Sequence, residues 1–138
     1  MQLENSNLFQ TNAFINGQWT TAKGAKVFEV KNPFDNSTVA EVADCGKEET
    51  RQAIESAQSA FQAWRKTTAG ERSTLLRNWY QLIMENLDDL AYLLTLEQGK
   101  PISEAKGEIK YGGSFIEWFS EEAKRTYGDV IPPHRSDV

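Results

Sequence analysis

The chain has one thiol and one imidazole, the side chains that most often carry out nucleophilic catalysis. Cys45 lies between Asp44 and Gly46, where the local charge is acidic, whereas a reactive thiolate needs an electropositive setting and a base. His134 lies in a proline-flanked tail, and nothing in the spacing of the two residues favours a Cys–His dyad. The pattern therefore predicts a structural Cys45 and no catalytic residue in this chain.

Metal and nucleotide sites have little support in the sequence. One Cys and one His cannot complete a structural zinc site, and no Asp-x-Asp-x-Asp loop offers calcium ligands. Adjacent carboxylates such as Glu121-Glu122 point in different directions on a helix, so we expect them to lie on solvent-exposed helix faces rather than to form an acid/base pair. Glu121 is expected to pair with Arg125, four residues later. Glycine-rich phosphate loops are absent, so we expect no metal-binding and no cofactor-binding residue.

The elements that would position any site begin with strands and turns, predicted over residues 12–44 after a polar start that we expect to be loose. Asn16-Gly17 lies between apolar flanks and predicts a type I′ hairpin, because both residues tolerate positive φ. Val27–Val30 and Thr38–Ala43 are rich in β-forming residues. We expect these strands to form a small antiparallel sheet.

Residues 46–127 have the apolar period of helices. Thr68 and Glu71 form a capping box that starts the second of about four helices, and Asn86 is expected to cap the third. Gly99 and Pro101 are expected to end that third helix, because glycine accepts the left-handed position and proline cannot continue the turn. The pattern predicts an α+β, mostly helical fold over 1–138, with its helices packed into a bundle.

A last helix is predicted from Ser103 to Tyr127, followed by a tail over residues 128–138. Gly112-Gly113 within it costs about 1 kcal/mol per glycine relative to alanine. The pair indicates close approach of another backbone or a ligand, or else a kink or a later helix start. Phe115, Trp118 and Phe119 lie on the same helix. At helical spacing such residues usually pack in a core, and an apolar ligand tunnel is the alternative.

The amino-acid composition limits the classes of partner that this chain is expected to bind. The net charge of -5 and the absence of a basic run disfavour nucleic acid and anionic membranes. No apolar run approaches the roughly 18 residues that span a bilayer. The polar N-terminus and the single cysteine predict a cytoplasmic, reducing compartment.

Several short motifs occur in one order along the chain: Ile15–Trp19, Asn32-Pro33, Ala57–Trp64, Glu71-Arg72 and Glu97–Pro101. Each motif alone is weak, but the ordered set, from Phe14 to Pro132, resembles the N-terminal portion of the NAD(P)-dependent aldehyde dehydrogenases. Glu117–Arg125 with Tyr127–Asp129 is similar to the succinate-semialdehyde dehydrogenase branch.

The resemblance implies an α/β subunit of which this chain is the N-terminal part without the Rossmann core. The parent enzyme would oxidise succinate semialdehyde to a carboxylic acid with NAD or NADP. Phe115 and Trp118 match positions of aromatic substrate-tunnel residues in that branch, and Glu97 lies near a position associated with a structural cation in some relatives. The family's cofactor loops, nucleophilic cysteine, general base and substrate-carboxylate arginines have no counterpart here.

Two interpretations follow from the resemblance. The first is an N-terminal fragment of a semialdehyde dehydrogenase, structural and inactive alone, which meets a small-molecule aldehyde only in the complete enzyme. The alternative is a non-catalytic helical module that binds itself or a full-length dehydrogenase. Both predict exposed apolar surface on the last helix, and we expect self-association as a dimer or larger.

Overall fold

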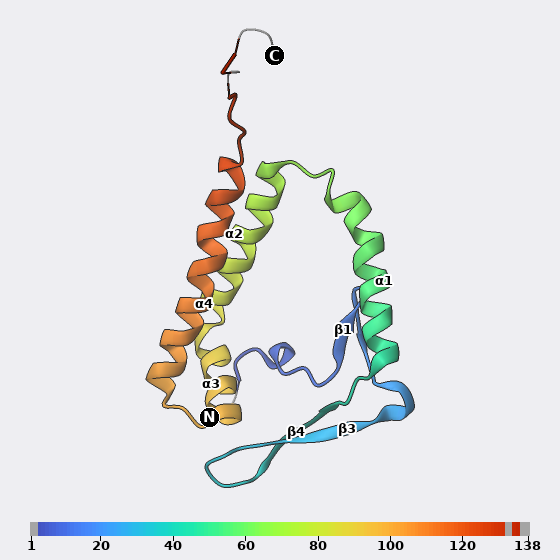
Figure 1. The fold of residues 1–138 in the computed structure, drawn as a ribbon. Coiled ribbons are helices and arrows are strands. Elements are labelled where there is room, and N and C mark those ends of the chain that lie inside the picture. The colour runs from blue at the N-terminus through green and yellow to red at the C-terminus, as the bar shows by residue number, and fades with distance from the viewer. Residues whose placement is uncertain (1–2, 132–133, 136–138) are drawn as a thin grey trace.

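The computed structural model describes residues 3–131 and 134–135, and the chain runs through two small antiparallel sheets into four α-helices (Figure 1). This arrangement confirms the α+β, mostly helical fold class. The strands are β1 Ala13–Ile15, β2 Gln18–Thr20, β3 Val27–Lys31 and β4 Thr38–Ala43; the helices are α1 Lys47–Trp64, α2 Ala69–Glu85, α3 Leu87–Gln98 and α4 Ile102–Glu122; and the 3₁₀ turns are η1 Ser6–Leu8, η2 Lys23–Ala25 and η3 Ala123–Arg125.

The predicted hairpin is confirmed, since β1 and β2 pair antiparallel across Asn16 at φ 52° and Gly17 at φ 77°. The rings of Phe14 and Trp19 lie opposite each other with centroids 5.0 Å apart. β3 and β4 also pair antiparallel. The expectation of one sheet is wrong, because the described strands form two separate two-stranded sheets. The turn η2, with Gly24 at φ 73°, separates them.

The predicted helix ends are confirmed at two places. The Thr68 hydroxyl accepts a hydrogen bond from the Glu71 N–H at 3.2 Å, and the Glu71 carboxylate accepts one from the Thr68 N–H at 2.7 Å. Gly99 ends α3 in the left-handed region at φ 72°. Asn86 occupies the predicted N-cap position of α3, but its side chain makes no cap hydrogen bond there and instead donates to the Leu82 carbonyl at 2.8 Å.

α4 packs antiparallel against α2, and α3 packs beside α4. Gly113 lies where a Cβ would come within 2.9 Å of the Met84 Cε and 3.5 Å of the Tyr80 ring. The close approach predicted at this glycine is therefore present, made by α2 side chains rather than by a backbone or a ligand. α4 begins at Ile102 and continues through Gly112 and Gly113, so the later helix start is excluded. It ends at Glu122, before the turn η3, rather than at Tyr127.

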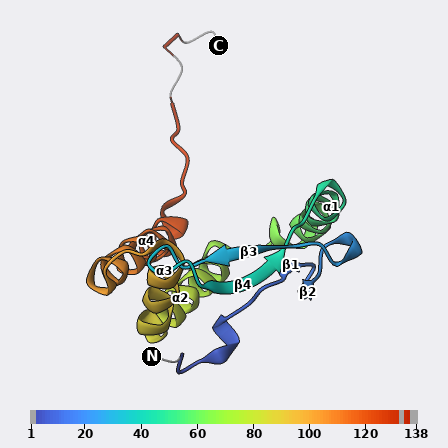
Figure 2. The same cartoon turned by 90° about the horizontal axis from the view of Figure 1, so that it is seen from below.

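The expected four-helix bundle is wrong for α1, which diverges from α2 and packs mainly on β1 (Figures 1 and 2). The Arg72 side chain organises the intervening turn, donating from Nε to the Thr67 hydroxyl and from Nη2 to the Thr67 carbonyl, both at 2.9 Å. Its guanidinium also lies 5.9 Å from the centroid of the Trp64 ring. These contacts fix the turn between the end of α1 and the start of α2, from which the two helices diverge.

The N-terminal segment is held rather than loose. Asp89 of α3, only 8% exposed, accepts hydrogen bonds from the N–H groups of Glu4 at 3.0 Å and Asn5 at 2.8 Å. The Asn5 side chain donates to the Asn86 side chain at 3.2 Å. Met1 and Gln2 lie outside the described residues. The polar composition of this segment thus reflects a polar anchor on α3.

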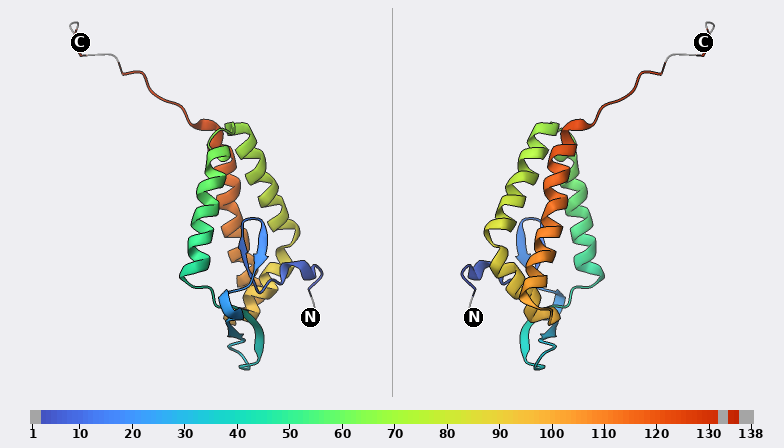
Figure 3. Two further views of the ribbon diagram at one scale, coloured as in Figure 1. Left: turned by 90° about the vertical axis from the view of Figure 1, so that its right-hand side faces the viewer. Right: turned by 90° about the vertical axis from the view of Figure 1, so that its left-hand side faces the viewer.

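The predicted tail leaves the end of α4 and runs clear of the other elements (Figure 3). Residues 128–131 and 134–135 form no helix or strand, and the rest of the predicted tail lies outside the described residues. No helix within the described ranges combines the length and the apolar character needed to cross a membrane.

Glu49 joins the start of α1 to the turn η2. The residue is 6% exposed. Its carboxylate accepts hydrogen bonds at 2.8 Å from the N–H groups of Gly46 and Lys23. These bonds, that of Gly46 foremost, hold the pKa of Glu49 below the ordinary value. A carboxyl with a lowered pKa in the folded state stabilises the fold above its unfolded pKa and loses that contribution as the pH falls through the lowered value.

Acidification from pH ~5 to ~3 should therefore lower the melting temperature of the chain, since an ordinary glutamate has a pKa of about 4.3. Glu49→Gln should be less stable than the parent near neutral pH and should lose less stability over that interval. Thermal unfolding followed by circular dichroism across the pH range measures both. A parallel pH dependence in parent and variant would contradict the assignment.

Candidate functional site

The outward side of α4 presents a row of aromatic rings. Tyr111, Phe115, Trp118 and Phe119, here called the aromatic face, are 66%, 47%, 64% and 57% exposed. Their spacing places the first three on the side of the helix opposite Gly113, which packs on α2. Within the described chain, then, these rings do not pack in a core, although helical spacing usually indicates one.

Phe115 lines an open groove of ≈ 590 Å³ at the junction of three helices, together with Ile83 of α2 and Leu90 and Leu94 of α3. Tyr111 meets Phe115 edge to face, with ring centroids 4.9 Å apart and planes at 80°. Sequence reasoning missed Tyr111, although its position four residues before Phe115 on one helix could have indicated it.

Trp118 lines a neighbouring hollow of ≈ 600 Å³, formed by α4 and by Arg125 just beyond it. Phe115 and Trp118 thus lie on one helix side but line adjacent hollows rather than a single cavity. Both hollows are open to solvent in this chain. The role of the two residues in a substrate tunnel stays a prediction.

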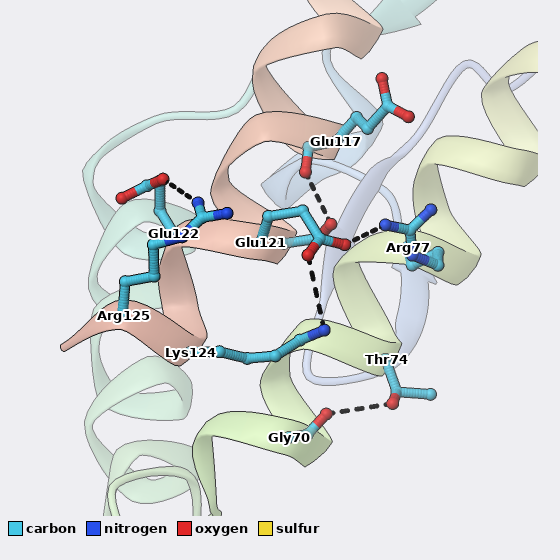
Figure 4. A network of polar contacts seen from close by, with 9 residues as sticks. Gly70, Thr74, Arg77, Glu117, Glu121, Glu122, Lys124 and Arg125 are labelled. Carbon is cyan, nitrogen blue, oxygen red and sulfur yellow. Dashed lines mark hydrogen bonds and ion pairs between the residues drawn. The ribbon is translucent and has the colours of Figure 1, made fainter.

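Two of the three glutamates that line the hollow beside Trp118, Glu121 and Glu122, are paired within the chain (Figure 4). Glu121 forms a salt bridge with Arg77 of α2 and lies 3.6 Å from Lys124, and Arg125 pairs with Glu122. The expected Glu121–Arg125 pair is therefore wrong, because α2 supplies a partner that the sequence spacing could not indicate. The hydrogen bond from Arg77, with the Lys124 charge, holds the pKa of Glu121 below the ordinary glutamate value.

This pairing decides what the hollow can bind. Its charged lining consists of three glutamates and one arginine, and that arginine, Arg125, is already paired with Glu122. An anionic group would therefore be repelled there, whereas an apolar carbon chain could pack on the Trp118 ring. In the described part of the chain, the site offers apolar contact without recognition of a negative charge.

The structure does not bring Cys45 and His134 together. Cys45 is exposed just before α1, while the tail that carries His134 leaves from the far end of α4 (Figure 1). Lys23 and Lys26 share a shallow hollow with Cys45 and Asp44, so the setting of the thiol is mixed rather than acidic. Among the described residues, no imidazole lines the hollow that contains the thiol.

The described residues do not fit a dinucleotide cofactor. Both sheets are antiparallel pairs, so there is no parallel strand–turn–helix unit among them. The helix start preceded by a glycine is that of α1, and there the Gly46 N–H already donates to Glu49. Glu97 is exposed at the end of α3, and no group of three or more metal-ligating side chains occurs in the described ranges.

The profile of the aldehyde dehydrogenase family matches residues 19–138. The chain is 55% identical over 137 residues to succinate-semialdehyde dehydrogenase [NADP(+)] of Escherichia coli, and 54% identical over 137 residues to glutarate-semialdehyde dehydrogenase of Pseudomonas putida. Each alignment covers 99% of this chain and 28% of the relative, so the chain spans little more than a quarter of the length of the curated relatives it matches.

The fold agrees equally well with a solved structure. A crystal structure of an E. coli NADP dependent enzyme superposes with a TM-score of 0.95 at 54% sequence identity, covering 99% of this chain and 28% of that one. The divergence of α1 from α2 and the N-terminal segment anchored on α3 therefore match a conformation that exists within a much longer chain.

Proposed function

This chain belongs to the aldehyde dehydrogenase family, and we propose on that basis that it forms the N-terminal part of a semialdehyde dehydrogenase. Its role there is to present the aromatic face of α4 to the aldehyde substrate. The observation that carries the proposal is the exposure of Phe115 and Trp118 beside two open hollows, on the helix that is similar to the succinate-semialdehyde branch.

The substrate class is a short aldehyde with an acid group at its other end, oxidised to the corresponding carboxylic acid. Succinate and glutarate semialdehyde, named for the two relatives above, share that chemistry and differ by one methylene. Because the chain is 55% and 54% identical to those relatives, overall identity does not choose between the two substrates. The carboxylate must be recognised outside this chain, since the hollow beside Trp118 is lined by glutamates.

The complete enzyme uses NAD or NADP, and the name of the E. coli relative favours NADP. The described residues offer neither a phosphate loop nor a positioned base, so the chain alone is a structural, inactive part. We also propose a cytoplasmic location, which the single cysteine, unable to form a disulfide within the chain, supports.

A chimera tests the proposal. Residues 1–138 are joined to the remaining part of the E. coli relative, and NADPH or NADH formation is followed with each semialdehyde. The chimera should turn over one or both substrates, whereas the 138-residue chain alone should produce no reduced cofactor. Phe115→Ala and Trp118→Ala in the chimera should each lower kcat/KM about 10-fold or more, mainly through KM, because each removes apolar contact with the substrate.

Phe34→Ala is the matched control, because this ring is 91% exposed in the turn between β3 and β4 and lines neither of the two hollows. It should leave kcat/KM within about 2-fold of the parent, as a surface substitution does. Unchanged kinetics in both α4 variants would remove the aromatic face from the substrate path.

Self-association is a second candidate role, favoured by the exposure of the aromatic face. Isolated apolar faces of this kind tend to be buried against another chain. We expect sedimentation at micromolar concentration to show a dimer or larger species. Phe115→Glu with Trp118→Glu should shift it to monomer, whereas Gln52→Glu with Ser59→Glu, which adds the same charge on exposed positions of α1, should not. A monomeric parent chain would contradict this role.

A further inference from the structure

The turn between β1 and β2 contains the Asn-Gly pair that specifies the hairpin, and the proposed function makes no use of it. Asn16-Gly17 is the only Asn-Gly pair in the sequence. Both residues are exposed in the described chain, and neither lines the two hollows on α4. Such a pair has a reactivity of its own, because attack by the glycine nitrogen on the asparagine amide carbon closes a five-membered ring.

The turn leaves this attack open. β1 and β2 pair from Ile15 and Gln18 outward, so the Gly17 N–H lies beyond the paired residues. A Cβ at Gly17 would meet nothing within 4 Å, and glycine brings no Cβ of its own to shield its nitrogen. Each strand has three residues, and a hairpin of two strands is marginally stable in water. Asn16, at φ 52°, can therefore leave its left-handed conformation by a local opening of the turn.

The helix α1 supplies a third group. The Ser56 hydroxyl donates a hydrogen bond to the Asn16 side-chain oxygen, Oδ1, at 3.3 Å, from a position 40 residues later in the chain. α1 packs on β1, so the hydroxyl is presented by a helix and not by the turn itself. Negative charge develops on Oδ1 when a nucleophile adds to the amide carbon, and a donor aimed at that oxygen stabilises it. Sequence spacing could not have indicated this contact.

Asn36 is an internal comparison, since it also lies exposed in a hairpin turn with a positive φ, of 61°. The next residue there is Ser37, which has a Cβ. Its N–H donates to the Asp35 carboxylate at 3.0 Å, so the nitrogen that would attack is engaged. The two turns therefore share backbone conformation and exposure but differ in the nucleophile.

We propose that Asn16 is a site of spontaneous deamidation, at which the Gly17 nitrogen is the nucleophile and the Ser56 hydroxyl stabilises the developing oxyanion. A bond forms between the Gly17 nitrogen and the Asn16 Cγ, the bond from Cγ to Nδ2 breaks, and ammonia leaves with the proton of the Gly17 N–H. Water then adds to either carbonyl of the resulting succinimide, which gives aspartate or isoaspartate. The reaction needs no oxidant or reductant, and water is its only co-reactant.

The two products differ in what they do to the fold. Aspartate tolerates the left-handed region, and the Ser56 hydroxyl would donate to its carboxylate in a stronger, charge-assisted hydrogen bond. Isoaspartate carries the main chain through its Cβ, which lengthens the turn and breaks its match to the strand register. The contact between the Phe14 and Trp19 rings, with centroids 5.0 Å apart, would then be lost. Formation of isoaspartate thus loosens the hairpin beside α1.

The test is incubation of the 138-residue chain in neutral and in mildly alkaline buffer. Peptide mass spectrometry with electron-transfer fragmentation then distinguishes aspartate from isoaspartate. Both products should accumulate at position 16, at a rate that rises in proportion to the hydroxide concentration, because the nucleophile is the deprotonated nitrogen. Asn36 should react at least about 10-fold more slowly, equivalent to about 1.4 kcal/mol in the barrier. An unmodified Asn16, or equal rates at the two positions, would overturn the proposal.

A matched pair of serine variants tests the oxyanion contact. Ser56→Ala should slow the deamidation of Asn16 about 5-fold, equivalent to about 1 kcal/mol, the net contribution of a neutral hydrogen bond. Ser59→Ala, at an exposed position of α1, should leave the rate unchanged. In urea, where α1 is unfolded, the parent and Ser56→Ala should react at the same rate, which separates the contact from any effect of the local sequence. A rate that is equal or faster in folded Ser56→Ala would overturn the role of the hydroxyl.

Discussion

Replacing Gly99 by valine should lower the free energy of unfolding by about 3 kcal/mol, one of the two largest effects expected in this chain. Gly99 has a φ of 72°, where a residue with a Cβ is strained by about 1–2 kcal/mol. A Cβ there would also lie 2.7 Å from the Cγ of Pro33, and the proline ring cannot rotate away. Overpacking of this kind adds about 1–3 kcal/mol.

Urea denaturation followed by circular dichroism measures the change. Gly107→Val is the matched control, because Gly107 lies in α4, where a Cβ would meet nothing within 4 Å. It should leave the stability within about 0.5 kcal/mol of the parent. A loss below about 1 kcal/mol for Gly99→Val would show that the β3–β4 hairpin moves away from α3 without cost.

Replacing Asp89 by alanine should lower the free energy of unfolding by about 3 kcal/mol as well. The carboxylate accepts two backbone N–H groups, from Glu4 and Asn5, and hydrogen bonds to a charged group contribute about 1.5–3 kcal/mol each. Release of the N-terminal segment into water recovers part of that loss, because the freed N–H groups become hydrated. The variant should therefore lose the segment from α3 while keeping its helices.

Amide hydrogen exchange reports this directly, as a loss of protection at Glu4 and Asn5. The adjacent Asp88→Ala is the matched control, because the Asp88 side chain is 73% exposed and makes a surface ion pair with Lys106 at 2.8 Å. Such a pair contributes about 0–1 kcal/mol. If both variants lost the same stability, the hydrogen bonds to Asp89 would contribute no more to the free energy of unfolding than a surface ion pair.

The local elements were predictable because their signals lie within a few residues. Asn16-Gly17 specifies the hairpin, Thr68 with Glu71 starts α2, and Gly99 ends α3, in each case through backbone preferences that need no distant partner. The same is true of the apolar stripe on α4, which follows from the helical period.

The aromatic residues of the site were also found from the sequence, but their environment was not. Phe115 and Trp118 were placed by resemblance, whereas their exposure and their separation into two hollows depend on where α2 and α3 lie. Glu121 was expected to pair along its own helix, and Arg77, 44 residues away, takes it instead.

Which segments become strands and helices could be read from the residues, because φ preferences, caps and apolar period act over a few positions. The end of the last helix could not: α4 stops at Glu122, before the predicted Tyr127. The divergence of α1 from the other helices, the anchoring of the N-terminal segment on Asp89 and the choice of which apolar stripes stay uncovered depend on the tertiary structure. The physical reason is that an apolar stripe specifies burial but not the partner, so its covering depends on contacts between residues far apart in the chain.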